Sequence, residues 1–100
     1  MNIRIYRGTN QIGGSCVELE ALDGSRIILD AGMPLTKPDG SDWPRGMVKH
    51  SCAELREKGI LPMVSGLFRD DSPNVLAVIV SHAHMDHYGI VHTIHPKVPV

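Results

Sequence analysis

Four side chains that commonly bind metal ions lie within six residues of one another, directly before Tyr88. They are His82, His84, Asp86 and His87, in the segment HAHMDH. Neutral imidazole is the commonest metal ligand in proteins, and a carboxylate adds a hard oxygen ligand. A loop that leaves a sheet can point alternate side chains the same way, so the spacing predicts that His82 and His84 share one ion. Asp86 and His87 are offset towards a second ion.

Such a pair of ions has a defined chemistry. Two ions held about 3.5–4 Å apart stabilise both the attacking and the leaving oxygen of a hydrolysis, and they lower the pKa of a shared water. The alternative interpretation is a histidine-rich surface loop with adventitious affinity for metals. A lone HxH would fit that alternative, whereas the six-residue pattern directly after an apolar strand is far more specific. The sequence therefore predicts a metal site.

The elements that must position this segment are mostly strands. The run 75–80 (VLAVIV) is apolar throughout and rich in β-branched residues, which predicts a strand buried on both faces. Alternating or apolar segments at 3–6, 17–21 and 26–29 predict three more strands, with a tight turn at 23–25. These three strands are expected to form an antiparallel meander.

The remaining segments predict little regular structure. Residues 33–48 carry three prolines, two glycines and the only tryptophan, as expected of a loop. A short helix is predicted over 49–58, with Ser51 as its N-cap, Glu54 completing a capping box and Gly59 at its C-terminal end. Residues 90–94 are a second short helical segment, which Pro96 ends.

The quoted segments resemble those of the metallo-β-lactamase superfamily. The resemblance rests on HAHMDH after AVIVS and on RIILDAG at 26–32. GTNQIGGSCVELE (8–20) and DAGMPL (30–35) are similar to the ribonuclease J and cleavage-factor branch, whose members pair this fold with a β-CASP domain and cut RNA. The resemblance implies an α/β (α+β) fold in which residues 1–100 form the N-terminal half of an αββα sandwich, an incomplete domain with metals at one edge of its sheets.

The resemblance also implies a role for each matching residue. His82 and His84 match ligands of the first metal, and Asp86 and His87 match ligands of the second. Asp86 is in addition the catalytic candidate, because it can orient the attacking water. Asp30 matches the aspartate that supports the metal loop by hydrogen bonding, as carboxylates around metal sites often do. The alternative for Asp30 is an ordinary turn residue at the end of a strand.

The sequence departs from the family pattern in its missing ligands. The family needs a further His for each ion and a bridging Asp, all well downstream, and only His92 and His95 follow the motif here. Neither lies where the family places those ligands, and catalytic zinc normally has three protein ligands. We therefore expect that this chain alone does not hold a competent dinuclear centre, and that one apolar face of its sheet is left bare.

Other candidate residues have ordinary structural interpretations. His92 and His95 are expected on a helix end near solvent, and Cys16 is expected to pack in the core rather than to act in redox chemistry. Trp43 could stack on a nucleobase, but a loop tryptophan more often closes the edge of a core. The basic side chains of the helical region could contact phosphates, although a solvated helix face explains them as well; they are Arg45, Lys49, Arg56 and Lys58.

Composition excludes several classes of protein. Ten Lys and Arg against eleven Asp and Glu give a net charge of −1, which argues against a domain that coats nucleic acid through overall charge. The longest apolar run has six residues, far short of the roughly 20 that a membrane span needs, so no membrane association is expected. Two cysteines do not make a disulfide framework, and a reduced, cytoplasmic location is expected.

The predicted function of the complete fold is metal-assisted hydrolysis of a phosphodiester, with RNA as the leading substrate. Two zinc ions are expected, and manganese is the alternative because aspartate and water ligands suit it. Hydrolases of thioesters, lactones and small phosphodiesters share the same motif and remain open. So does a non-catalytic metal-binding or interaction fragment. A homo-oligomer or a complementing C-terminal segment could complete the site.

Overall fold

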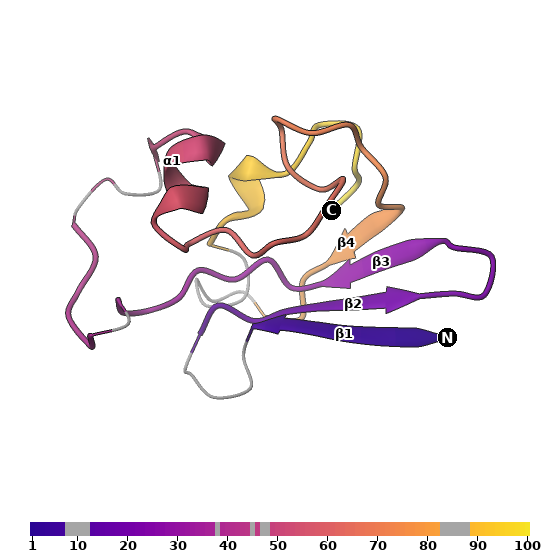
Figure 1. The fold of residues 1–100 in the computed structure, drawn as a ribbon, viewed down its shortest axis with the longest axis horizontal. Coiled ribbons are helices and arrows are strands. Elements are labelled where there is room, and N and C mark those ends of the chain that lie inside the picture. The colour runs from indigo at the N-terminus through magenta and orange to yellow at the C-terminus, as the bar shows by residue number, and fades with distance from the viewer. Residues whose placement is uncertain (8–12, 38, 45, 47–48, 83–88) are drawn as a thin grey trace.

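The structure is a computed structural model that describes residues 1–7, 13–37, 39–44, 46, 49–82 and 89–100. Its centre is a four-stranded sheet in the order β1-β2-β3-β4, built by Asn2–Arg7, Cys16–Glu20, Arg26–Leu29 and Ala77–Ile79. The first three strands are antiparallel, and β4 is parallel to β3 (Figure 1). Helix α1 (Cys52–Glu57) and the 3₁₀ turn η2 (Val91–Thr93) complete this mixed α/β fold.

The predicted meander is confirmed, and its second turn shows why the chain reverses there. The Asp23 carboxylate accepts a hydrogen bond from the Ser25 backbone N–H at 2.9 Å, and Gly24 adopts a φ of 88°. Aspartate and glycine are the residues that such turns favour, because one bonds to its own backbone and the other tolerates positive φ. The turn sets a register in which Glu20 lies opposite Arg26.

Strand β4 reaches the sheet only after a long crossover, which carries α1. A parallel pair needs such a connection because its two strands run in the same direction. Figure 1 shows α1 and the segments that follow it on one side of the sheet. The consequence for function is that β3 and β4 end at the same edge, where the Asp30 N–H donates to the Ile79 carbonyl at 2.8 Å.

Helix α1 is shorter than predicted but is capped as the sequence indicates. The Ser51 hydroxyl accepts a hydrogen bond from the Glu54 N–H at 3.3 Å, and it also lies 3.1 Å from Glu54 Oε1. Gly59 follows the helix with a φ of 78°. Leu55 is fully buried in the hydrophobic core and Cys52 packs against that core, so these two side chains anchor the helix.

The core lies between the sheet and these crossover segments. We call the covered side of the sheet the inner face, which carries Cys16, Glu18, Ile28 and Val78. The crossover and the C-terminal segment contribute most of the remaining core, namely Leu55, Ile60, Leu67, Phe68, Ile90 and Ile94. Within the described ranges, no helix is both long and apolar enough to cross a membrane.

The opposite side of the sheet, the open face, is apolar and uncovered by any described segment. Strand register places eight residues on it: Ile3, Ile5, Val17, Leu19, Ile27, Leu29, Ala77 and Ile79. Ile3 is 63% exposed, and Ile79 is 52% exposed. The prediction that residues 75–80 form a strand buried on both faces is therefore wrong. A continuous apolar run does not reveal which faces are covered, and here β4 spans only Ala77–Ile79.

The two faces make a testable contrast. In the 100-residue chain, Ile3→Ala is expected to change the free energy of unfolding by no more than about 0.5 kcal/mol, because the side chain is already largely hydrated. Ile28→Ala, on the fully buried inner face, is expected to cost about 2–5 kcal/mol. Urea unfolding of both variants measures the difference. Equal losses would mean that another part of the protein or a second copy covers the open face in solution.

Candidate metal centre

The candidate site lies where β3 and β4 end side by side. Asp30 directly follows β3, and Ser81 and His82 come two and three residues after the end of β4. Functional residues of sheets with parallel strands commonly gather beyond the carboxyl ends of those strands. The pairing of Leu29 with Ile79 therefore brings together Asp30 and Ser81, which are 51 positions apart in the chain.

Asp30 holds the start of the predicted metal loop. Its Oδ1 accepts the Ser81 backbone N–H, and its Oδ2 accepts the Ser81 hydroxyl, both at 2.7 Å. Asp30 has a φ of 65°, a left-handed conformation that aspartate tolerates better than most residues. Asp30 is 7% exposed, whereas Ser81 is exposed, so the two contacts join a buried carboxylate to a residue at the surface.

Ser81 links Asp30 to His82, the first histidine of the motif. The Ser81 Oγ lies 3.1 Å from His82 Nδ1. A hydroxyl has one proton, and this one is donated to the Asp30 carboxylate, so Oγ is left to accept from Nδ1–H. That tautomer places the coordinating lone pair on Nε2. The arrangement fits a metal-binding imidazole, whose other ring nitrogen is normally held by a carboxylate or another polar group.

The other predicted ligands lie outside the described residues. His84, Asp86 and His87 fall in 83–88, so their role as ligands remains a prediction. Within the parts of the chain that the structure describes, no group of three or more His, Cys, Asp or Glu side chains is placed to hold a metal. His95 Nδ1 accepts the Lys97 N–H at 3.1 Å, in keeping with a structural role near the chain surface.

Comparison with known proteins gives a family for this combination of fold and motif. Residues 10–100 match the family model of the Metallo-beta-lactamase superfamily. The chain belongs to this superfamily. It is also 37% identical over 89 residues to an RNase J-like protein of Methanocaldococcus jannaschii. That match covers 89% of this chain but 14% of the relative, so the chain corresponds to a small part of the relative's length.

Ser81 is the residue at this metallo-β-lactamase site that sequence reasoning missed. The predicted ligands begin at His82, although a serine stands directly before it, after the apolar run 75–80. A hydroxyl side chain at that position is a usable signal, because it can link a carboxylate to the adjacent imidazole. Its contacts to both Asp30 and His82 make it part of the support of the metal loop.

Replacing Ser81 tests this link. We expect Ser81→Ala to lower the affinity for Co²⁺ about tenfold, because His82 loses the group that fixes its tautomer. The free energy of unfolding should change by less than about 1 kcal/mol, since the side chain is exposed. Absorption titration with Co²⁺ measures the affinity, and Ser72→Ala, at another exposed serine, is the control. Equal affinities in the two variants would show that Ser81 does not support the site.

Two further side chains have the structural roles expected of them. Cys16 is fully buried, and burial raises the pKa of its thiol to about 12, which leaves little reactive thiolate at neutral pH. Trp43 packs against the core and donates its indole N–H to the Pro34 carbonyl at 3.1 Å. These contacts direct both side chains into the protein, in keeping with structural roles.

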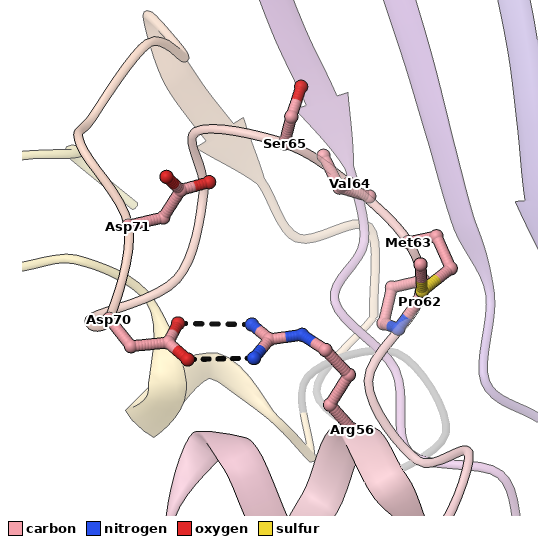
Figure 2. Close-up of a pocket in the computed structure, with 7 residues that line it drawn as sticks. All are labelled: Arg56, Pro62, Met63, Val64, Ser65, Asp70 and Asp71. Atoms are coloured by element: carbon pink, nitrogen blue, oxygen red, sulfur yellow. Dashed lines mark hydrogen bonds and ion pairs between the residues drawn. The ribbon is translucent and has the colours of Figure 1, made fainter.

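Arg56 is engaged within the protein as well. It pairs with Asp70 through two hydrogen bonds of 2.7 and 3.0 Å, and its guanidinium lies 5.8 Å from the centre of the Phe68 ring. Figure 2 shows this pair across a shallow pocket. The pocket lining contains none of the predicted metal ligands; it is formed by Arg56, Pro62, Met63, Val64, Ser65, Asp70 and Asp71.

Proposed function

We propose that residues 1–100 are the N-terminal part of a metal-dependent hydrolase that cleaves phosphodiester bonds in RNA. The observation that carries this proposal is the hydrogen-bonded series Asp30–Ser81–His82, which prepares an imidazole at the start of HAHMDH. Membership of the superfamily supports hydrolysis, and the relative described as RNase J-like supports RNA as the substrate.

In this proposal each residue of the motif has a defined role, and Asp86 has two. His82 and His84 bind the first ion, and Asp86 and His87 bind the second. Bound metal ions supply a water of lowered pKa and polarise the scissile phosphoryl group. Asp86 orients the attacking water, while Asp30 acts through Ser81 to keep the ring of His82 in place. Zinc is our first choice, and manganese is the alternative.

The described residues also bear on how the site is completed. His82 is a single histidine ligand candidate among them, and catalytic zinc sites normally have three protein ligands. We propose that the further ligands come from a complementing C-terminal segment or from a second copy of the chain. Cys16 and Cys52 are both free thiols, which supports a reduced, cytoplasmic setting.

Two alternative functions can be distinguished from this one by experiment. A hydrolase of thioesters, lactones or small phosphodiesters would use the same motif. A non-catalytic module that docks through its sheet is favoured by one specific observation, the uncovered apolar open face. Metal-dependent turnover distinguishes both enzymes from the module, and the substrate distinguishes the enzymes from each other.

The first experiment is a measurement of metal per chain after dialysis against a weak chelator, on protein purified without added metal. The proposal expects bound ions once the further ligands are supplied, and their number should fall in His82→Ala and not in His95→Ala, a matched histidine outside the motif. Cleavage assays with RNA, single-stranded DNA and a thioester then follow, each with and without Zn²⁺ or Mn²⁺. No retained metal and no turnover would leave the non-catalytic module, and turnover of the thioester alone would replace RNA as the substrate.

A further inference from the structure

An irregularity near the end of β1 gives Arg7 an unusual environment. Ile5 pairs with Val17, but Arg7 pairs with Cys16, so Tyr6 is an extra residue in β1. Such a bulge redirects the side chains that follow it. Tyr6 bonds to Glu18 on the inner face, and Arg7 also turns inward, where its guanidinium reaches the segment that follows α1.

Arg7 donates hydrogen bonds to three backbone carbonyls that are distant in sequence. The distances are 2.7 Å to Gly14, 2.8 Å to Gly32 and 3.1 Å to Gly59. A side chain at position 14 would not fit beside it, because a Cβ there would lie 2.6 Å from Arg7 Nε. A guanidinium can bind several acceptors in fixed directions. The Arg7 side chain therefore joins β1 to three segments: the one before β2, the one after β3 and the one after α1.

The charge of the half-buried Arg7 is compensated differently from that of the buried Arg26. Arg26 is balanced by Glu18, whereas the hydrogen bonds described for Arg7 all go to carbonyls. Burial lowers the pKa of Arg7, as expected where a cation leaves water without a carboxylate beside it. An arginine nevertheless stays protonated in proteins, so these are charge-assisted bonds.

The Gly32 carbonyl belongs to the short segment that presents Asp30. Hydrogen bonds tie each residue of this segment to a different neighbour: Asp30 N–H to Ile79, the Ala31 carbonyl to the Ile90 N–H, and Gly32 N–H to Ser15. Arg7 supplies the contact at the far end, two residues from Asp30. Loss of that contact would release the end of the segment and alter how the Asp30 carboxylate meets Ser81.

We propose that Arg7 is a positioning residue for Ser81 and His82, which precede the rest of the predicted metal-binding motif. By joining the carbonyls of Gly14, Gly32 and Gly59, it fixes the backbone from which Asp30 holds Ser81 and, through Ser81, the ring of His82. The functional part of this inference rests on the proposed metal function. Its structural part is that the Asp30–Ser81 contact depends on Arg7, and this can be tested without any metal.

The test compares Arg7→Met, which has no donors, with Arg4→Met as the matched control on the same strand. The hydrogen bond and ion pairs described for Arg4 go to Glu18 and Glu20, on β2, and not to the Asp30 segment. Hydrogen exchange of the Ser81 N–H is measured against that of the Val78 N–H, which lies in β4, donates to Pro99 and reports on general loosening around that strand. We expect about tenfold faster relative exchange at Ser81 in Arg7→Met and no relative change in Arg4→Met.

Two further readouts separate positioning from general loosening. The ¹⁵N shifts of the His82 ring should show the Nδ1–H tautomer in the parent chain and a mixture in Arg7→Met. Co²⁺ affinity should fall by about tenfold in the same variant. Arg7→Lys keeps the charge but cannot span three carbonyls, so it should show the same changes. It is the deciding variant where Arg7→Met does not fold.

Each outcome bears on the inference in a definite way. Selective changes at Ser81 and His82 with Co²⁺ binding support it together with the proposed metal function. The same changes in a preparation that contains the further ligands but binds no Co²⁺ support the positioning effect and overturn the metal function. Relative exchange at Ser81 that is the same in the Arg7 and Arg4 variants overturns the inference, whatever the affinity for metal.

Discussion

Replacing Glu18 with leucine is expected to destabilise the fold by about 3–5 kcal/mol, because it leaves a buried arginine without its counter-ion. Glu18 is fully buried on the inner face of β2. It accepts hydrogen bonds from Arg4, from the Tyr6 hydroxyl at 2.9 Å and from Arg26 at 2.5 and 3.0 Å. A loss of this size is comparable with the whole stability of a small domain.

Arg26 makes the loss larger than a single ion pair would suggest. Its Nη1 donates to the carbonyls of Ser65 at 3.0 Å and Asn74 at 3.3 Å, so the cluster joins the sheet to the crossover segment. Urea unfolding measures the effect, and Glu20→Leu, on the same strand but only partly buried, is the control. The double variant Glu18→Leu/Arg26→Met should recover part of the loss, since it removes the orphaned charge. A single variant as stable as the control would contradict the prediction.

The same cluster predicts how stability depends on pH. Burial alone would raise the pKa of Glu18, but hydrogen bonds from Arg26, Tyr6 and Arg4 together outweigh it, and the pKa lies below its ordinary value of 4.5. A lowered folded-state pKa contributes stability above the unfolded-state value, and this contribution is lost as the pH falls through the folded-state value. We expect stability to decline below about pH 4.5, with a smaller decline in Glu18→Gln.

The largest expected effect on metal binding is that of Asp30→Asn, which should lower the affinity for Co²⁺ by about 10- to 100-fold. An amide can still accept the Ser81 N–H through its oxygen, but its NH₂ group cannot accept the Ser81 hydroxyl proton. The hydroxyl is then free to donate to His82 instead, which favours the wrong tautomer. Asparagine tolerates the φ of 65° at this position, so the backbone is retained.

Two comparisons isolate this effect from a loss of folding. Asp39→Asn removes another turn carboxylate, which bonds to Ser41 in an exposed loop, and should leave Co²⁺ affinity unchanged. Asp30→Ala loses the carboxylate and also places an alanine in a left-handed conformation, at a further cost of about 1–2 kcal/mol. Calorimetry with Co²⁺ and urea unfolding give the two quantities separately. Parent-like affinity in Asp30→Asn would remove Asp30 from the metal-binding machinery.

Local sequence signals correctly predicted the elements whose structure depends on residues close to one another in the chain. The 23–25 turn, the strand Arg26–Leu29 and the Ser51 cap all rest on contacts between residues close in the chain, and all are found. The motif itself was also visible, because its four predicted ligands lie within six residues of the chain. The resemblance supplied Asp30, which spacing alone would not have linked to residues 51 positions away.

The features that were missed depend on tertiary contacts. Glu18 looks like a solvent-facing residue of an alternating strand, yet two arginines and a tyrosine allow it to be fully buried. Ile79 looks like a core residue, yet no described segment covers its face of the sheet. In both cases the polarity of the residue suggests the wrong exposure. The side of the sheet on which the crossover packs determines whether the residue is buried.

The long crossover between β3 and β4 also sets the order of events in folding. The β1–β2–β3 meander closes through short connections and can form early, whereas β3–β4 pairing must close a loop of nearly half the chain. Contacts of high sequence separation slow folding, because the entropy of closure is lost before the contact forms. We therefore expect the Asp30–Ser81 contact to form last, so that a newly made chain acquires the edge proposed to bind metal only once the rest has folded.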